Sequence, residues 1–220
     1  MEHTKILEHI DHTLLKAVSD WGGIKKLCDE AIQYGTASVC VPPSYIKRIH
    51  SEYPSLNICT VIGFPLGYNT TAVKVLEVRE AIADGANEVD MVVNLGDVKN
   101  GAFDQVTAEI AALKAAAGGH ILKVIIETCY LTQEEKIALC KCVTDGGADF
   151  IKTSTGFGTD GATIEDVELF KKHIGGNVKI KAAGGVKSEA DLEMFLNAGC
   201  ERIGTSSAVS ILNAGKAGAY

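Results

Sequence analysis

Eight short apolar runs recur along the chain, separated by stretches with the periodicity of amphipathic helices. The runs are rich in Val and Ile and are mostly apolar on both faces, which is typical of parallel strands covered by helices. They begin near Ile10, Ala37, Ile58, Glu88, Ile121, Asp149, Val178 and Arg202. The alternation therefore predicts an α/β fold built from eight strand–helix units.

Chain length narrows the architecture further. Eight strand–helix units in 220 residues leave little room for anything else, and α/β barrels commonly have about 200–250 residues. Thr132 with Glu135, and Ser188 with Asp191, have the spacing of capping boxes that begin helices. We expect a (β/α)8 TIM barrel, a single domain over residues 1–220 with a mobile tail at about 215–220. A doubly wound open sheet is the alternative.

Charged residues inside the apolar runs are informative because alternate side chains of a barrel strand point into the lumen. Four consecutive runs place charges on this face, namely Asp90, Lys123, Lys152 and Lys181. Glu127 lies near the expected rim, and Asp11 and His12 are candidates from the first run. Catalytic groups of barrel enzymes gather at the carboxyl ends of the strands, so these side chains are candidate site residues.

Lys152 and Lys181 end neighbouring runs, and lysine is almost never fully buried without a partner. One interpretation is structural, with each lysine paired to a lumen carboxylate. The other is imine chemistry, in which one lysine must be neutral near pH 7 to attack a carbonyl. An ordinary lysine has a pKa of about 10.4, and burial beside a second ammonium group can lower it by the required amount of about 3. Spacing does not decide which lysine is the nucleophile.

Asp90 and Cys40 each have two interpretations. A buried aspartate among lysines either balances charge or handles protons, activating water for carbinolamine formation or shuttling a proton with Lys181. The Cys40 thiol could be a nucleophile, but no cation adjoins it in the sequence, so a structural thiol is favoured.

Glycine-rich segments follow the last two runs. Gly184 and Gly185 follow one run, and Gly204 with Ser206 and Ser207 follows the next. In barrels, the loops after strands seven and eight often hold a phosphate with backbone N–H groups, and hydroxyl groups add donors. The pattern predicts one phosphate site at these two strand ends.

Composition and charge exclude several function classes. The formal net charge of −7 argues against nucleic acid as a partner, because phosphate contacts need a basic face. Seven cysteines, an odd number without Cys-x-x-Cys spacing, indicate a reducing cytoplasm rather than disulfides. We expect no metal and no cofactor, because no metal-ligand spacing occurs. We also expect no signal peptide and no membrane span.

Six segments together resemble the deoxyribose-phosphate aldolase family of class I aldolases, and the resemblance runs essentially end to end. These segments are 10–16, 61–65, 88–94, 122–128, 152–157 and 181–186. The resemblance implies a metal-independent carbon–carbon lyase. Its members reversibly cleave 2-deoxy-D-ribose 5-phosphate into acetaldehyde and D-glyceraldehyde 3-phosphate, in deoxyribonucleoside catabolism.

The resemblance also implies roles for individual residues. Lys152 matches the Schiff-base lysine, Lys181 the second lysine that makes the first one nucleophilic, and Asp90 the acid/base aspartate. The candidate substrate or phosphate contacts are Asp11, Thr13, Lys123, Thr155, Gly184, Gly185, Gly204, Ser206 and Ser207. Some members end in a tyrosine that carries protons, so Tyr220 is a further catalytic candidate. Members of the family have either lysine or phenylalanine at the position of Phe157, so this chain resembles the members that have no lysine contact to the phosphate there.

Two other functions stay open at this stage. One is a different Schiff-base aldolase or transaldolase acting on phosphorylated sugars, and the other is a catalytically silent phosphate-binding barrel. In each case the expected partner is a small phosphorylated molecule. The sequence does not give the oligomeric state, and a homodimer or a higher homo-oligomer is compatible with it.

Overall fold

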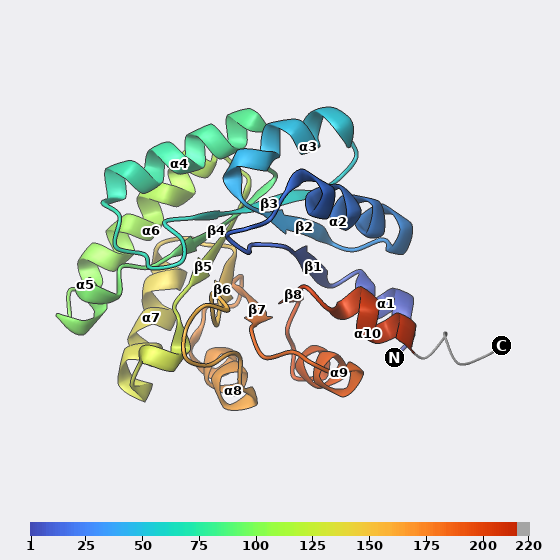
Figure 1. Ribbon diagram of the computed structural model, residues 1–220. Coiled ribbons are helices and arrows are strands. Elements are labelled where there is room, and N and C mark those ends of the chain that lie inside the picture. The colour runs from blue at the N-terminus through green and yellow to red at the C-terminus, as the bar shows by residue number, and fades with distance from the viewer. Residues whose placement is uncertain (215–220) are drawn as a thin grey trace.

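The eight runs form one closed parallel barrel in the computed structural model, which describes residues 1–214 (Figure 1). The strands pair in chain order, and β8 closes the ring by pairing with β1. They are β1 (Ile10–Thr13), β2 (Ser38–Val41), β3 (Ile58–Ile62), β4 (Glu88–Val92), β5 (Ile121–Ile125), β6 (Phe150–Lys152), β7 (Lys179–Ala183) and β8 (Arg202–Thr205). The TIM barrel is therefore confirmed, and the open-sheet alternative is wrong because β1 and β8 have no free edge.

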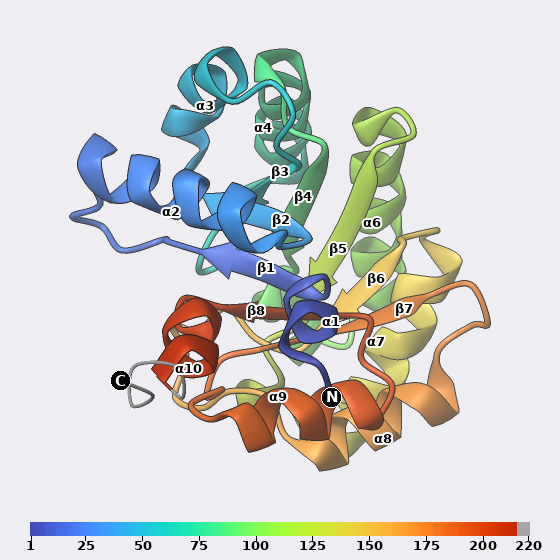
Figure 2. The same cartoon turned by 90° about the vertical axis from the view of Figure 1, so that its right-hand side faces the viewer.

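Helices form the outer layer of the barrel (Figures 1 and 2). They are α1 (His3–Leu7), α2 (Trp21–Tyr34), α3 (Ile46–Glu52), α4 (Thr71–Asp84), α5 (Leu95–Lys99), α6 (Phe103–Ala117), α7 (Gln133–Asp145), α8 (Ile164–His173), α9 (Glu189–Asn197) and α10 (Ala208–Ala214), with short 3-10 helices at Pro43–Tyr45 and Thr128–Tyr130. Thr132 and Ser188 begin α7 and α9 with complete capping boxes, as the sequence predicts. Within residues 1–214, none of the helices is long and apolar enough to cross a bilayer.

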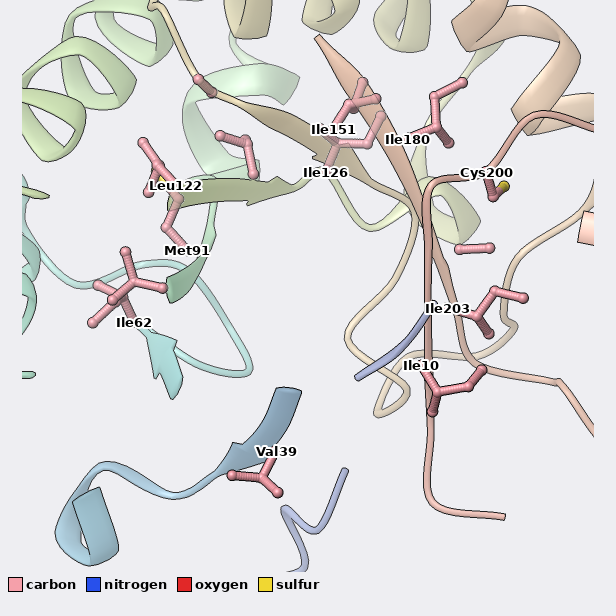
Figure 3. Close-up of a cluster of buried hydrophobic side chains, with 14 of the residues drawn as sticks. Ile10, Val39, Ile62, Met91, Leu122, Ile126, Ile151, Ile180, Cys200 and Ile203 are labelled. Carbon is pink, nitrogen blue, oxygen red and sulfur yellow. The ribbon is translucent and has the colours of Figure 1, made fainter. Parts of the chain in front are cut away.

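The main apolar core lies between the strands and the helices. Each strand contributes a buried residue to this cluster (Figure 3): Ile10, Val39, Ile62, Met91, Leu122, Ile151, Ile180 and Ile203. Burying an aliphatic side chain of this size contributes about 1.5–3 kcal/mol. Successive side chains of a strand point to opposite faces. Because these residues face the helices, the residues next to them in each strand point into the lumen.

A buried ion pair joins α4 and α6 to the end of β4. Lys74 of α4 is fully buried, and its Nζ donates to Glu109 Oε2 of α6 at 3.0 Å and to the Val92 carbonyl at 2.8 Å. The lysine stem runs past Gly63, where a Cβ would lie 2.7 Å from Lys74 Cε. Burial lowers the pKa of Lys74, although Glu109 opposes this. Since β4 also carries Asp90, the pair holds that strand in place against the helices.

We expect Glu109→Leu to lower the free energy of unfolding by about 3–5 kcal/mol, because Lys74 then stays buried without a carboxylate. The double variant Lys74→Met/Glu109→Leu should regain most of this loss, since neither charge remains. Guanidinium chloride unfolding followed by circular dichroism measures both values. Equal instability of the single and double variants would show that the unpaired lysine is not the cause.

Candidate active site

Three buried lysines donate to one carboxylate in the barrel lumen. Asp90 accepts hydrogen bonds from Lys152 at 2.8 Å and from Lys181 at 2.7 Å through the same oxygen, Oδ2. Its other oxygen, Oδ1, accepts from Lys123 at 2.9 Å. The four residues come from the neighbouring strands β4 to β7, and none is more than 3% exposed. The structure thus brings together the four lumen charges that strand parity indicated.

A second tier of charges lies against this cluster. Lys123 contacts Glu88 at 2.5 Å, and Lys181 also pairs with Asp11. Arg202 of β8 bridges the two carboxylates, with Nη1 at 2.5 Å from Asp11 and Nη2 at 2.9 Å from Glu88. We call the following seven residues the lumen network: Asp11, Glu88, Asp90, Lys123, Lys152, Lys181 and Arg202.

Members of the lumen network stabilise one another's charged forms. Burial raises the pKa of Asp90, but the ammonium groups of Lys123, Lys152 and Lys181 outweigh it and hold this pKa well below its ordinary value. Burial lowers the pKa of Lys181, but the carboxylates of Asp11 and Asp90 outweigh it and raise this pKa above its ordinary value. The pKa of Lys123 is likewise raised, with Asp90 outweighing burial. At neutral pH, Asp90 is therefore an anion, and Lys123 and Lys181 are cations.

The lumen network contains one more basic group than acidic groups. Its three carboxylates face three lysines and one arginine. Lys123 contacts three of the carboxylates and Lys181 contacts two, whereas Lys152 contacts Asp90 alone. A buried charge without a partner is strongly unfavourable. Among the three lysines, Lys152 thus has the fewest ion pairs. When Lys152 is neutral, the network contains three anions and three cations.

A pocket of about 400 Å³ opens above the lumen network at the carboxyl ends of the strands. Lys152 borders this pocket, whereas Lys181 has no exposed surface and lies beneath it. The other expected site residues that border it are Thr13, Thr155, Gly184, Gly185, Gly204, Ser206 and Ser207. A molecule in the pocket can therefore reach the amine of Lys152 before it reaches Lys181.

The glycine-rich segments form one wall of the pocket. Gly184 and Gly185 have φ values of 79° and 77°, a conformation that side chains other than that of glycine rarely adopt. Within the following segment, the N–H of Ser207 donates to Thr205 Oγ1 at 3.2 Å, while Ser206 is exposed. The wall combines closely approachable backbone with hydroxyl groups, which suits an anion such as a phosphate.

Glu127 holds the loop that follows Lys152. It has a φ of 54°, which is unusual for a residue other than glycine and often marks a functional segment. Its carboxylate accepts from the Thr155 N–H at 3.0 Å and from the Thr155 hydroxyl at 2.5 Å. The same hydroxyl oxygen accepts from the Phe157 N–H at 2.9 Å. Thr155 therefore shapes the pocket wall, and its hydroxyl is already engaged within the loop.

Three other expected site residues do not border the pocket. Lys123 and Asp11, expected as substrate contacts, have no exposed surface and are members of the lumen network beneath the pocket. His12 points out of the lumen, and its Nε2 lies 2.8 Å from Glu30 of α2. The expected tail and Tyr220 lie outside the described residues.

Two residues near the site were missed by the sequence reasoning. Arg202 begins the last apolar run, and the parity that was applied to the other runs would have placed it in the lumen. Lys16 is exposed at the edge of the pocket, but it lies in a loop after β1, where no periodicity indicates the direction of a side chain.

Comparisons with known proteins identify the family of the chain. The sequence model of the family described as "DeoC/LacD family aldolase" matches residues 5–216. The deoxyribose-phosphate aldolase of Clostridium botulinum (strain Eklund 17B / Type B) is 65% identical over 213 residues, and that of Clostridioides difficile (strain 630) is 60% identical over 214 residues, each with 96% of both chains covered.

Solved structures agree with this assignment. A putative deoxyribose-phosphate aldolase from Coccidioides immitis has a TM-score of 0.94 at 38% identity, covering 98% of this chain and 87% of that one. A deoxyribose phosphate aldolase from Aeropyrum pernix, described as tetrameric, has a TM-score of 0.88 at 32% identity, covering 98% of this chain and 92% of that one. The family model and these relatives span nearly the whole chain, so it belongs to the DeoC/LacD family of aldolases.

Proposed function

We propose that this chain is a class I aldolase that reversibly cleaves 2-deoxy-D-ribose 5-phosphate into acetaldehyde and D-glyceraldehyde 3-phosphate, in deoxyribonucleoside catabolism. The observation that carries the proposal is the position of Lys152, which borders the pocket while sharing one oxygen of Asp90 with Lys181. The relatives at 65% and 60% identity bear the name of this activity. The Aeropyrum pernix relative is described as tetrameric, and we expect a homo-oligomer here, which analytical ultracentrifugation would test.

Lys152 is the nucleophile in this proposal. A lysine attacks a carbonyl only as the free amine, so its proton must leave before the reaction. Lys152 has one carboxylate partner, and the remaining six groups of the lumen network balance in charge once its proton has left. Lys181, in contrast, is held as a cation by Asp11 and Asp90. The two lysines therefore have different tasks, one as the amine and the other as a proton donor.

The reaction proceeds through an imine in the synthetic direction as follows. The amine of Lys152 adds to acetaldehyde to give a carbinolamine, which loses water to form an iminium ion. The iminium accepts the electron pair of a methyl C–H bond as the proton leaves, giving an enamine. The enamine carbon attacks the aldehyde carbon of D-glyceraldehyde 3-phosphate, and water then hydrolyses the new imine and releases the sugar phosphate.

Asp90 and Lys181 move protons during these steps. Both lysine nitrogens contact Oδ2 of Asp90, so the two nitrogens are no farther apart than the sum of 2.8 Å and 2.7 Å. A proton given up at Lys152 reaches that oxygen directly or through one water molecule, and the ammonium of Lys181 can return a proton to the leaving hydroxide. Proton transfer of this kind requires hydrogen-bond reach, which this geometry supplies.

The phosphate of the substrate lies against the glycine-rich wall in this proposal. Backbone N–H groups at Gly184 and Gly185 and the hydroxyls of Ser206 and Ser207 are the donors. Phe157 packs edge-on against Phe64 with ring centroids 5.3 Å apart, so it offers no charge to the phosphate. Lys16 supplies a cation at the pocket edge instead.

A substrate panel tests the activity itself. Purified protein should release acetaldehyde from 2-deoxy-D-ribose 5-phosphate, detected by a coupled alcohol dehydrogenase assay, and should act far less on ribose 5-phosphate and ketose phosphates. Preference for a ketose phosphate would instead identify another Schiff-base aldolase or a transaldolase.

Trapping tests the assignment of the nucleophile. Borohydride in the presence of acetaldehyde should leave a reduced two-carbon adduct on Lys152, located by peptide mass mapping. Lys152→Met should lower the rate of cleavage at least about 10⁴-fold, and adding Lys181→Met should lower it little further, because residues that act as a unit are not additive. An adduct on Lys181, or none at all, would contradict the proposal.

Lys16→Met should raise KM for 2-deoxy-D-ribose 5-phosphate about 10- to 100-fold, because a hydrogen bond to a charged group is worth about 1.5–3 kcal/mol. The catalytic efficiency with unphosphorylated 2-deoxy-D-ribose should stay unchanged, and Lys16→Arg serves as the matched control that keeps the charge. Steady-state kinetics with the two substrates measure the effect. Equal losses for both substrates would mean that Lys16 does not contact the phosphate.

A further inference from the structure

Two cysteines point into the lumen beside Asp90, and the proposed mechanism uses neither. Cys40 of β2 and Cys59 of β3 are register partners on adjacent strands, and both are buried. The Cys59 thiol donates to Asp90 Oδ1 at 3.2 Å. The two cysteines pack with Val61, Leu15 and Phe64.

The three side chains have the composition and spacing of a metal site. The sulfur atoms of Cys40 and Cys59 and a carboxylate oxygen of Asp90 all lie within 4.8 Å of one another. A tetrahedral zinc ion bound by two thiolates and a carboxylate places its ligand atoms about 3.5–3.8 Å apart. Thiolate ligands select zinc and cadmium over magnesium and calcium. We propose that Cys40, Cys59 and Asp90 form a binding site for a thiophilic divalent cation, and that such a cation inhibits the enzyme.

A second group of potential ligands does not form a separate site. Asp11, Cys59 and Glu88 also lie close together, but the ammonium of Lys123 already contacts all three, at 3.6, 3.3 and 2.5 Å. Lys123 thus occupies the position that a cation would take there. At the Cys40 side, Lys123 contacts Cys59 and Oδ1 of Asp90, and it keeps Glu88 and Asp11 as partners if a metal takes those two atoms. Lys152 and Lys181 contact the other oxygen of Asp90, Oδ2.

The charge balance of the lumen and the access from the pocket are also compatible with binding of a divalent cation. Each thiol loses one proton to solvent as its sulfur binds the metal, so two positive charges leave and the dication replaces them. The net charge of the lumen is therefore unchanged. Leu15 packs against the two cysteines and also borders the open pocket, so the site lies directly behind the pocket wall.

Inhibition follows from the position of Asp90 and rests on the proposed function. A metal beside Cys59 binds Oδ1 of Asp90 and withdraws negative charge from Oδ2, the oxygen that Lys152 and Lys181 share, so Asp90 becomes a weaker proton acceptor between the two lysines. The metal forms no covalent adduct with substrate and changes no oxidation state. A chelator should therefore restore the activity fully.

Cadmium binding tests the site directly. Titration of the full chain with Cd²⁺, in the presence of a phosphine reductant, should produce the ultraviolet absorbance of cadmium–thiolate bonds with one equivalent per chain. The cleavage rate should fall in parallel, EDTA should reverse both changes, and Mg²⁺ should cause neither. The variants Cys40→Ala and Cys59→Ala should each weaken cadmium binding at least about 100-fold, since even residues that only support metal ligands are worth 10–100-fold.

Cys200→Ala is the matched control, because Cys200 is also buried but lies in the core outside the lumen, near Ile203 (Figure 3). This variant should bind cadmium as the unchanged chain does. The inference is overturned if cadmium–thiolate absorbance is absent, or if it persists in Cys59→Ala. It is also overturned if bound cadmium leaves the cleavage rate unchanged. Absorbance that depends on both cysteines in a protein without aldolase activity would refute the proposed function and retain the metal site.

Discussion

The carboxylate of Asp90 is buried among three ammonium groups, and the arrangement of the lumen follows from that contact. Isolated, such a carboxylate would be strongly unfavourable in the barrel interior. Lys123, Lys152 and Lys181 remove the penalty, but they bring in more positive charge than one aspartate can balance. Asp11 and Glu88 supply the missing negative charge, and Arg202 joins these two. The result is a network whose charges balance after the loss of one proton, and Lys152 is its lysine with the fewest carboxylate partners.

The barrel makes this network possible because it separates two kinds of packing. Outward side chains such as Met91 and Ile180 form the apolar layer against the helices and stabilise the fold. Inward side chains of the same strands do not contribute to this apolar layer, so they can carry charge without weakening it. Depth along the lumen separates the two lysines, since Lys152 borders the pocket and Lys181 lies beneath it. The same depth places Cys40 and Cys59 beside Asp90, within reach of the same entrance.

Much of the fold could be predicted from the sequence, because parallel strands and amphipathic helices leave periodic patterns. Parity also predicted the lumen positions of Lys123, Lys152 and Lys181. It could not tell that Lys123 lies below the pocket, because depth depends on the stagger between strands. Lys16 was missed because loops have no periodicity. The position of His12 was not predicted because its partner, Glu30, belongs to a helix, and the pattern of a strand gives no information about contacts with helices. The catalytic roles, Tyr220, the single domain and the cytoplasmic location stay predictions.

The pH dependence of kcat/KM in Arg202 variants tests the central claim, that charge balance in the lumen network lets Lys152 lose its proton. Arg202→Met removes one cation, so the lumen network retains a proton up to a higher pH. The pH at which activity rises should therefore increase by about one unit, which corresponds to about 1.4 kcal/mol. Arg202→Lys should keep the original profile, and Arg202→Met/Glu88→Gln, which removes one charge of each sign, should restore it. An unshifted profile in Arg202→Met, with only a lower rate, would contradict the account.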